Sequence, residues 1–267
     1  MSEITVTRSV AAALPVLFDR LRERPLTLPV VWIATGGAGL VLQDLFLPTP
    51  PPWINDGSGL GRYVFILLGA NLLALVGVVI TATVVGDREL FRSSPEPTKE
   101  IARGLEKVAP YLLTLVVTVF RILLAALGSA PLVLLFGLFL FGAAQGSLAE
   151  ELEMAIVAAP ILLFGLFGFA RFGWAVYFAI LHGSGPITAL KKSKALYAGN
   201  RRTVWILTAL VLLLPLLASL LPGLLEMRNR QLIRGLSYLS SLWSFSVVGL
   251  VAIVIAGVRD EAEPDSA

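Results

Sequence analysis

Two arginine side chains lie within long apolar stretches of the sequence, where a charge is costly. Arg121 follows Thr114-Leu-Val-Val-Thr-Val-Phe, and Arg171 follows Phe164-Gly-Leu-Phe-Gly-Phe-Ala. A cation in the middle of a bilayer costs roughly 2.5–3.5 kcal/mol on insertion scales, so it calls for a functional explanation. A guanidinium group binds phosphate through two parallel hydrogen bonds, and the first interpretation is therefore a polar pocket for an anion such as a lipid phosphate.

The second interpretation of these arginines is structural. Each side chain could extend toward the membrane surface, or donate to carbonyl groups freed near a kink, and serve assembly alone. Each lies ten residues from the cytoplasmic end of its apolar block, which is about 15 Å along a helix. The two cations could therefore meet at one depth, and no Asp or Glu in the middle of a block would neutralise them. Both interpretations remain open.

The other residues that could carry chemistry do not form a catalytic set. The chain has no cysteine and a single histidine, His182, which argues against disulfides, thiolate chemistry and multi-histidine metal sites. Ser184 and Ser193 have no base beside them, and the three glutamates at 150–153 are typical of a solvated helix start. We therefore expect no catalytic residue, no metal site and no cofactor.

The composition is that of an integral membrane protein. Of the 267 residues, 57% are hydrophobic and 15% are charged, and the mean hydropathy is +0.84. Soluble domains are about 45–50% apolar and about 25% charged. The apolar residues fall in blocks of about 20 or more, the length of a helix that crosses roughly 30 Å of hydrocarbon. We therefore predict an all-α, polytopic membrane helical bundle.

Six membrane-spanning helices account for these blocks. We expect them at Thr27–Leu47, Tyr63–Val85, Tyr111–Phe141, Met154–Leu181, Val204–Leu221 and Ser237–Val258. The third block is too long for one straight crossing, and Gly128-Ser-Ala-Pro131 within it is a plausible break. One kinked helix and two separate helices both remain open for this block.

Basic residues predict the orientation, because cytoplasmic loops carry an excess of Lys and Arg near the ends of spans. One basic segment precedes the first span, and two others lie at Gly86–Pro110 and His182–Thr203. Six spans place all three on one side, which favours a cell-membrane protein with both termini in the cytoplasm. The loop at Pro222–Gly235 does not fit, because it carries three arginines yet falls outside.

Short amphipathic stretches precede the odd-numbered spans. We expect them as interfacial helices at Ser9–Leu21, Thr98–Val108 and Pro186–Tyr197, and their starts lie 89 and 88 residues apart. This spacing is consistent with a three-fold tandem repeat, in which each unit is an interfacial helix followed by a hairpin of two spans.

The predicted organisation is a single transmembrane domain at 1–260 followed by a short polar tail at 261–267. Within the domain, the tandem units would be 1–90, 91–182 and 183–260. Each Lys or Arg beside an anionic leaflet contributes about 1 kcal/mol to the free energy of binding to that leaflet. The candidate anion- or lipid-binding residues are Arg121, Arg171, Lys191, Lys192, Lys194, Arg201 and Arg202. Two other roles remain open for the cations of the loops: they could only set the orientation of the chain in the membrane, or they could dock a partner protein.

The run from Arg171 to Trp205 resembles a family of prokaryotic polytopic membrane proteins. It reads Arg171-Phe-Gly-Trp-Ala-Val-Tyr-Phe, and then Gly185-Pro-Ile-Thr-Ala-Leu-Lys-Lys-Ser193-Lys-Ala-Leu-Tyr-Ala-Gly-Asn-Arg-Arg. It is similar to the membrane domain attached to some glycerophosphoryl diester phosphodiesterases, which has an arginine in a span and then Ala-Leu, Ser, Leu and Gly-Asn at this spacing. Lys194 stands where an aromatic residue commonly follows the serine.

This resemblance covers 35 residues and implies a membrane module, associated with lipid, without an activity of its own. Nothing in the chain corresponds to the histidine and acidic metal ligands of the phosphodiesterase catalytic domain.

Our leading prediction is a non-enzymatic membrane module, of unknown process, that contacts anionic lipid, a partner protein or a second copy of itself, and no nucleic acid. The alternative is a small-solute or lipid transporter with a site near Arg121 and Arg171, since transporter sites often lie near the midplane between repeats. An enzyme acting on lipid ranks third, because the chain offers no base, nucleophile or metal set for it.

Overall fold

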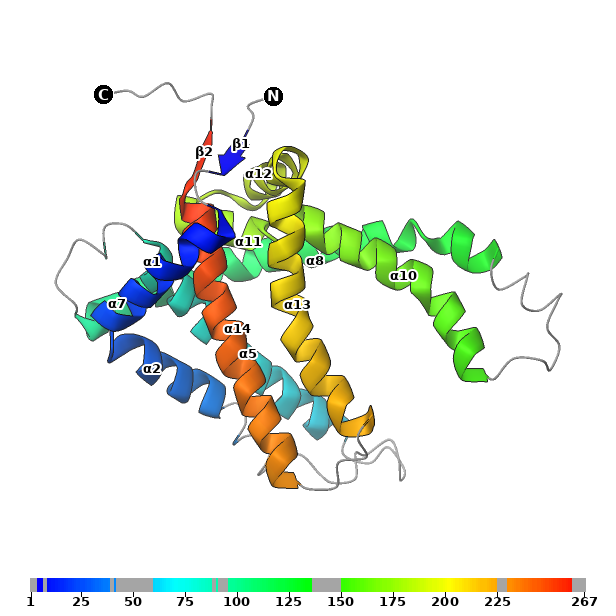
Figure 1. Ribbon diagram of the computed structural model, residues 1–267, viewed down its shortest axis with the longest axis horizontal. Coiled ribbons are helices and arrows are strands. Elements are labelled where there is room, and N and C mark those ends of the chain that lie inside the picture. Colours follow the sequence, from blue (N-terminus) through cyan, green and yellow to red (C-terminus); the bar gives the residue numbers. More distant parts are fainter. Residues whose placement is uncertain are drawn as a thin grey trace. The chain divides into compact units, whose positions relative to one another are not determined.

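The computed structural model describes residues 4–6, 9–38, 41, 60–87, 90, 96–135, 150–224 and 230–260 (Figure 1). Most of these residues are helical. The helices are α1 (Val10–Glu23), α2 (Thr27–Trp32), the π-helical turn η1 (Ile33–Gly37), α5 (Leu60–Gly86), α7 (Pro97–Glu106), α8 (Val108–Leu127), α10 (Glu150–Phe172), α11 (Ala175–His182), α12 (Pro186–Gly199), α13 (Arg201–Leu224) and α14 (Arg230–Ala256). Two short strands, β1 (Ile4–Val6) and β2 (Val258–Asp260), pair in a two-stranded sheet that the all-α prediction did not include.

Within the described residues, three helical runs are long and apolar enough to cross a membrane: Val64–Gly86, Pro97–Leu135 and Ala159–His182. They overlap the second, third and fourth predicted spans. Thr27–Gly37 and Leu242–Ala256 are shorter apolar helices. Parts of the first and third predicted spans, at 39–40, 42–47 and 136–141, lie outside the described residues. The predicted total of six spans therefore stays a prediction.

The long run Pro97–Leu135 is interrupted at Lys107 and again at Gly128 and Ser129. Helix α8 ends at Leu127, the Ser129 amide donates to the Ala126 carbonyl, and the Ser129 hydroxyl donates to the same oxygen at 2.6 Å. The chain then resumes a helix at 130–135. The break predicted at this place is confirmed, and it falls just before Pro131.

Amphipathic helices form at all three places where they were predicted, as α1, α7 and α12. Each buries a narrow face: Leu17 in α1, Gly104 in α7 and Leu196 in α12 are buried, whereas Phe18 in α1 and Ile187 in α12 are exposed. The three-fold repeat built on these helices stays a prediction.

The chain forms two compact units. Unit 1 comprises residues 1–5, 110–208 and 259–267, and unit 2 comprises 6–109 and 209–258. In unit 2, α14 packs along α5, and α1 packs on α14. Leu17 of α1 lies directly on the backbone of α14, because a Cβ added at Gly249 would be 2.8 Å from its Cδ1 atom.

Aromatic and hydroxyl groups connect α2 to its neighbours in unit 2. The Trp32 ring stacks on Phe245 of α14, with ring centroids 5.7 Å apart, and its Nε1 donates to Thr81 Oγ1 of α5 at 3.0 Å. Helix α7 also lies close on α5, since a Cβ at Gly104 would be 2.9 Å from the Cα atom of Ile80. Unit 2 is therefore centred on the second half of α5.

Unit 1 contains α10, α11 and α12, with α12 packed on both of the others. Helix α10 ends at Phe172, and a turn at Gly173 and Trp174 leads into α11. Trp174 is buried at this turn, where its Nε1 donates to the Ala170 carbonyl at 3.0 Å. Gly183, with φ of +58°, ends α11 in the left-handed region that favours glycine, and α12 begins at Pro186.

Candidate functional site

Helix α12 buries one face, and its exposed face carries the apolar Ile187 as well as Lys191 and Lys194. Ala189, Leu190, Ser193 and Leu196 are buried, and the Ser193 hydroxyl donates to the Arg171 carbonyl of α10 at 2.9 Å. Because this face is held against the neighbouring helices, the side chains of Lys191 and Lys194 are left exposed, and Lys192 is half-buried.

An aromatic cluster lies where α12 passes into α13. The Tyr197 ring makes edge contacts with Phe167 of α10 and Trp205 of α13, at centroid distances of 5.6 and 6.5 Å. The guanidinium carbon of Arg201 lies 5.9 Å from the centroid of Tyr197, within the range of a cation–π contact. Trp205 is 37% exposed. Tyrosine and tryptophan rings are enriched at the level of lipid headgroups, so this cluster has the composition of a membrane interface.

Four exposed cations define what we call the α12–α13 surface: Lys191, Lys194, Arg201 and Arg202. The sequence has no Asp or Glu anywhere between 154 and 225. Within the described residues, none of the four makes an ion pair; the described ion pairs are those of Arg24, Lys99 and Arg103. Among the described residues, no acid therefore pairs with the positive charge of this surface.

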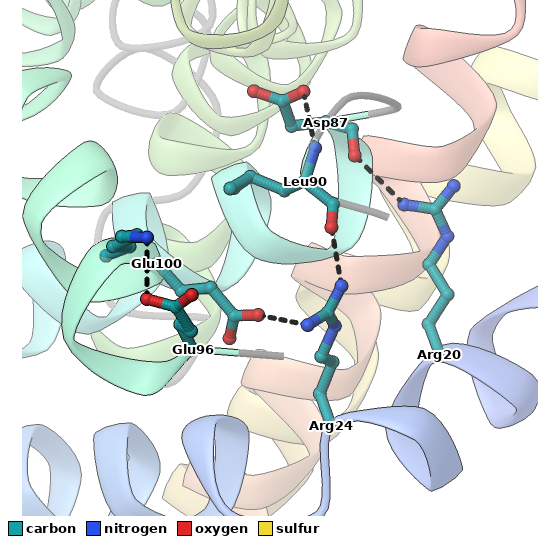
Figure 2. A network of polar contacts seen from close by, with 7 residues as sticks. Arg20, Arg24, Asp87, Leu90, Glu96 and Glu100 are labelled. Carbon is teal, nitrogen blue, oxygen red and sulfur yellow. Dashed lines mark hydrogen bonds and ion pairs between the residues drawn. The ribbon is translucent and has the colours of Figure 1, made fainter. Parts of the chain in front are cut away.

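Three arginines of unit 2, Arg20, Arg24 and Arg103, differ because their charges are bonded within the fold, and Figure 2 shows the first two of them. Arg24, just after α1, pairs with Glu100 of α7 at 2.5 Å, and their side chains are 4% and 2% exposed. The same guanidinium donates to the Leu90 carbonyl at 2.5 Å. Arg103 pairs with Asp87 at 3.0 Å. These charges hold α1 and α7 against the end of α5.

Arg20 has a similar structural role at the end of α5. Its Nη1 donates to the Val85 carbonyl, and it lies 3.5 Å from the Asp87 carbonyl. Free carbonyls at a helix C-terminus carry partial negative charge, so a buried guanidinium is well placed there. The network of Arg20, Arg24 and Glu100 was not predicted from the sequence. The signal for it is Glu100, an acid directly before the apolar Ile101 in an amphipathic helix.

Arg121 and Arg171 lie on different helices of unit 1. Arg121 is exposed on α8, whereas Arg171 is half-buried in the last turn of α10, with its guanidinium carbon 5.4 Å from the Phe172 ring centroid. The two helices approach closely nearby, since a Cβ at Gly168 would be 3.0 Å from Ala125 Cβ. No hydrogen bond, ion pair or ring contact among the described residues joins the two arginines, and a shared anion pocket stays a prediction.

A stripe of hydroxyl groups occupies the same side of α8 as Arg121. Tyr111, Thr114, Thr118 and Arg121 recur at spacings of three, four and three residues, which is one helical face. Thr114 and Thr118 are 0% and 2% exposed, and their hydroxyls have no hydrogen-bond partner among the described residues. Unpaired buried hydroxyls are costly and call for an explanation.

The described residues contain no group of His, Asp or Glu that could hold a metal ion. Comparison with protein-family models, with curated proteins and with solved structures finds no match for the chain. The resemblance of the run from Arg171 to Trp205 to a phosphodiesterase membrane domain therefore rests on its motif alone.

Proposed function

We propose that the chain is a non-enzymatic, multi-pass membrane module whose α12–α13 surface binds the headgroups of anionic lipids. The observation that carries this proposal is the contrast between the two sets of basic residues. Arg20, Arg24 and Arg103 of unit 2 are bonded to groups of the fold, whereas Lys191, Lys194, Arg201 and Arg202 are exposed and form no ion pair among the described residues. Each such cation contributes about 1 kcal/mol beside an anionic leaflet.

The proposed orientation is a six-span bundle with both termini in the cytoplasm. The pairing of β1 with β2 supports it, because a sheet that joins the two ends of the chain requires an even number of crossings. The proposal assigns the last two crossings to α13 and α14, which have 24 and 27 residues. The α12–α13 surface then faces the cytoplasmic leaflet, where anionic lipids gather.

The resemblance to a phosphodiesterase membrane domain is part of the same proposal. Arg171 and Ser193 are both motif residues, and the Ser193 hydroxyl donates to the Arg171 carbonyl. This contact supports treating the motif as one structural element that holds α12 on the end of α10.

The proposal is tested by mass spectrometry of the lipids that the purified protein retains. We expect wild type to retain phosphatidylglycerol in preference to phosphatidylcholine. The variant Lys191→Gln/Lys194→Gln/Arg201→Gln/Arg202→Gln should lose that preference at least tenfold, since four cations at about 1 kcal/mol each are removed.

The matched control is Arg22→Gln/Lys99→Gln, which removes exposed cations from the other two basic segments. It should keep the preference largely intact. Equal retention of both lipids by wild type, or an equal loss in the variant and the control, would contradict a specific α12–α13 site and would favour docking of a partner protein.

A second candidate function is transport of a small anion or lipid, and the hydroxyl stripe on α8 favours it. Thr114 and Thr118 place two buried, unpaired hydroxyls on the face that carries Arg121, and polar groups inside a membrane commonly line a substrate path. Uptake of inorganic phosphate into proteoliposomes tests this candidate. Uptake that is lost in Thr114→Val/Thr118→Val would support transport, and no uptake above that of empty liposomes would exclude phosphate as the substrate.

A further inference from the structure

We propose that the acidic C-terminal segment Glu261–Ala267 binds the α12–α13 surface and competes there with anionic lipid. This inference rests on the proposed function of that surface, and it names the group that occupies the surface when lipid does not.

The contacts of β1 connect the end of the chain to α12. The Asn200 side chain, at the C-terminal end of α12, donates from Nδ2 to the Ile4 carbonyl at 2.8 Å. A Cβ at Gly199 would be 3.1 Å from the same oxygen, so the strand backbone lies against the end of the helix. Strand β2 is hydrogen-bonded to β1 and ends at Asp260.

The described chain therefore ends at Asp260 on a strand paired with β1, and β1 contacts the end of α12 directly before Arg201 and Arg202. These residues belong to unit 1, which contains 1–5, 110–208 and 259–267. The exceptions are Val6 of β1 and Val258 of β2, which belong to unit 2. The segment does not need to move between units to reach the basic surface.

The charges of the two parts are complementary. Glu261, Glu263 and Asp265 follow directly after Asp260, and 260–267 contains no Lys or Arg. The α12–α13 surface, in turn, lies in a stretch without any acid between 154 and 225. These carboxylates directly follow a strand that pairs with β1, the strand that contacts the end of α12.

The segment is also long enough. Seven residues extend over roughly 23–25 Å at most, and α12 with its 14 residues is about 21 Å long. Carboxylates tethered at this range reach an effective concentration of the order of millimolar. They can therefore compete with dilute anionic lipid, and a leaflet rich in anionic headgroups should displace them.

Carbodiimide cross-linking of the full chain in neutral detergent detects the contact directly. We expect amide cross-links from Glu261 or Glu263 to Lys191 or Lys194, identified by peptide mass spectrometry. Saturating phosphatidylglycerol should suppress them at least fivefold, and phosphatidylcholine should leave them unchanged.

Neutralising the segment tests the competition. Glu261→Gln/Glu263→Gln/Asp265→Asn should raise the affinity for phosphatidylglycerol about five- to tenfold, because three screened charge contacts are removed. The substituted residues follow the last strand, β2. The matched control Asp19→Asn/Glu23→Gln/Glu106→Gln removes three exposed acids elsewhere and should change the affinity less than twofold.

Two patterns of results separate this inference from the proposed function. The competition would be overturned if no cross-links form, if they persist at saturating phosphatidylglycerol, or if neutralising the segment leaves the lipid affinity unchanged. In each of these cases the proposed function of the α12–α13 surface would still stand, provided that the four-cation variant loses lipid. If the four-cation variant retains as much lipid as wild type, the proposed function itself is overturned, whatever the segment does.

Discussion

Replacing Glu100 by glutamine is expected to lower the free energy of unfolding by about 3–5 kcal/mol. Glu100 and Arg24 are 2.5 Å apart, and both side chains are almost completely buried. The variant keeps the shape of the side chain and removes only its charge, so the Arg24 guanidinium is left buried without a counterion. The measurement is reversible chemical unfolding of the purified protein in detergent, followed by tryptophan fluorescence.

The exposed pair Lys99–Glu96 provides the control within the same helix region. Its atoms are 2.8 Å apart, but the side chains are 75% and 50% exposed, so Glu96→Gln should cost less than about 1 kcal/mol. A double variant, Arg24→Met/Glu100→Met, should recover part of the loss because no unpaired charge remains. Equal effects of Glu100→Gln and Glu96→Gln would show that the buried pair does not stabilise unit 2.

The second large effect is expected at the turn between α10 and α11, where Trp174→Ala should cost about 3–5 kcal/mol. The ring is 1% exposed and makes an edge contact with Phe169 at 5.7 Å. Its removal leaves a cavity and also deletes the hydrogen bond to the Ala170 carbonyl. Thermal unfolding in detergent measures the loss, and α12 should become more accessible to protease because it packs on α11.

Two further variants separate the contributions of the ring, its hydrogen bond and the burial of the site to the expected loss of stability. Trp174→Phe keeps most of the ring but removes the hydrogen bond, so it should lose much less than Trp174→Ala. Trp243→Ala removes the same residue type at a position that is 36% exposed, and its cost should also be clearly smaller. A Trp174→Ala variant as stable as Trp243→Ala would refute a structural role for this turn.

Helix positions were the most predictable part of the fold. In a membrane the backbone must bond within its own segment, so an apolar block such as the one at α5 has few alternatives to a helix. The amphipathic helices were also predictable, because apolar residues recur at helical spacing. The break beside Gly128 was predictable from the Gly-Ser-Ala-Pro sequence. Strands β1 and β2, with three residues each, are too short to show any periodicity.

The functional residues were less predictable, because their environment depends on distant partners. In the sequence, Arg24 and Lys194 are both loop cations beside an apolar block. The structure pairs Arg24 with an acid 76 positions away and leaves Lys194 exposed, a difference that no local pattern carries. The distance between Arg121 and Arg171 also has no local signal in the sequence, because it depends on how α8 and α10 pack.

The most direct test of the central claim uses the absence of cysteine from the chain. Ala198→Cys places a single fluorophore on the exposed side of α12, and Ala102→Cys places the same fluorophore on α7. Energy transfer to a minor fraction of acyl-labelled lipid in neutral vesicles reports local lipid enrichment. We expect phosphatidylglycerol to exceed phosphatidylcholine at position 198 but not at 102, with the excess falling at high salt. Equal transfer from both lipids at position 198 would contradict an anion-binding surface on α12 and α13.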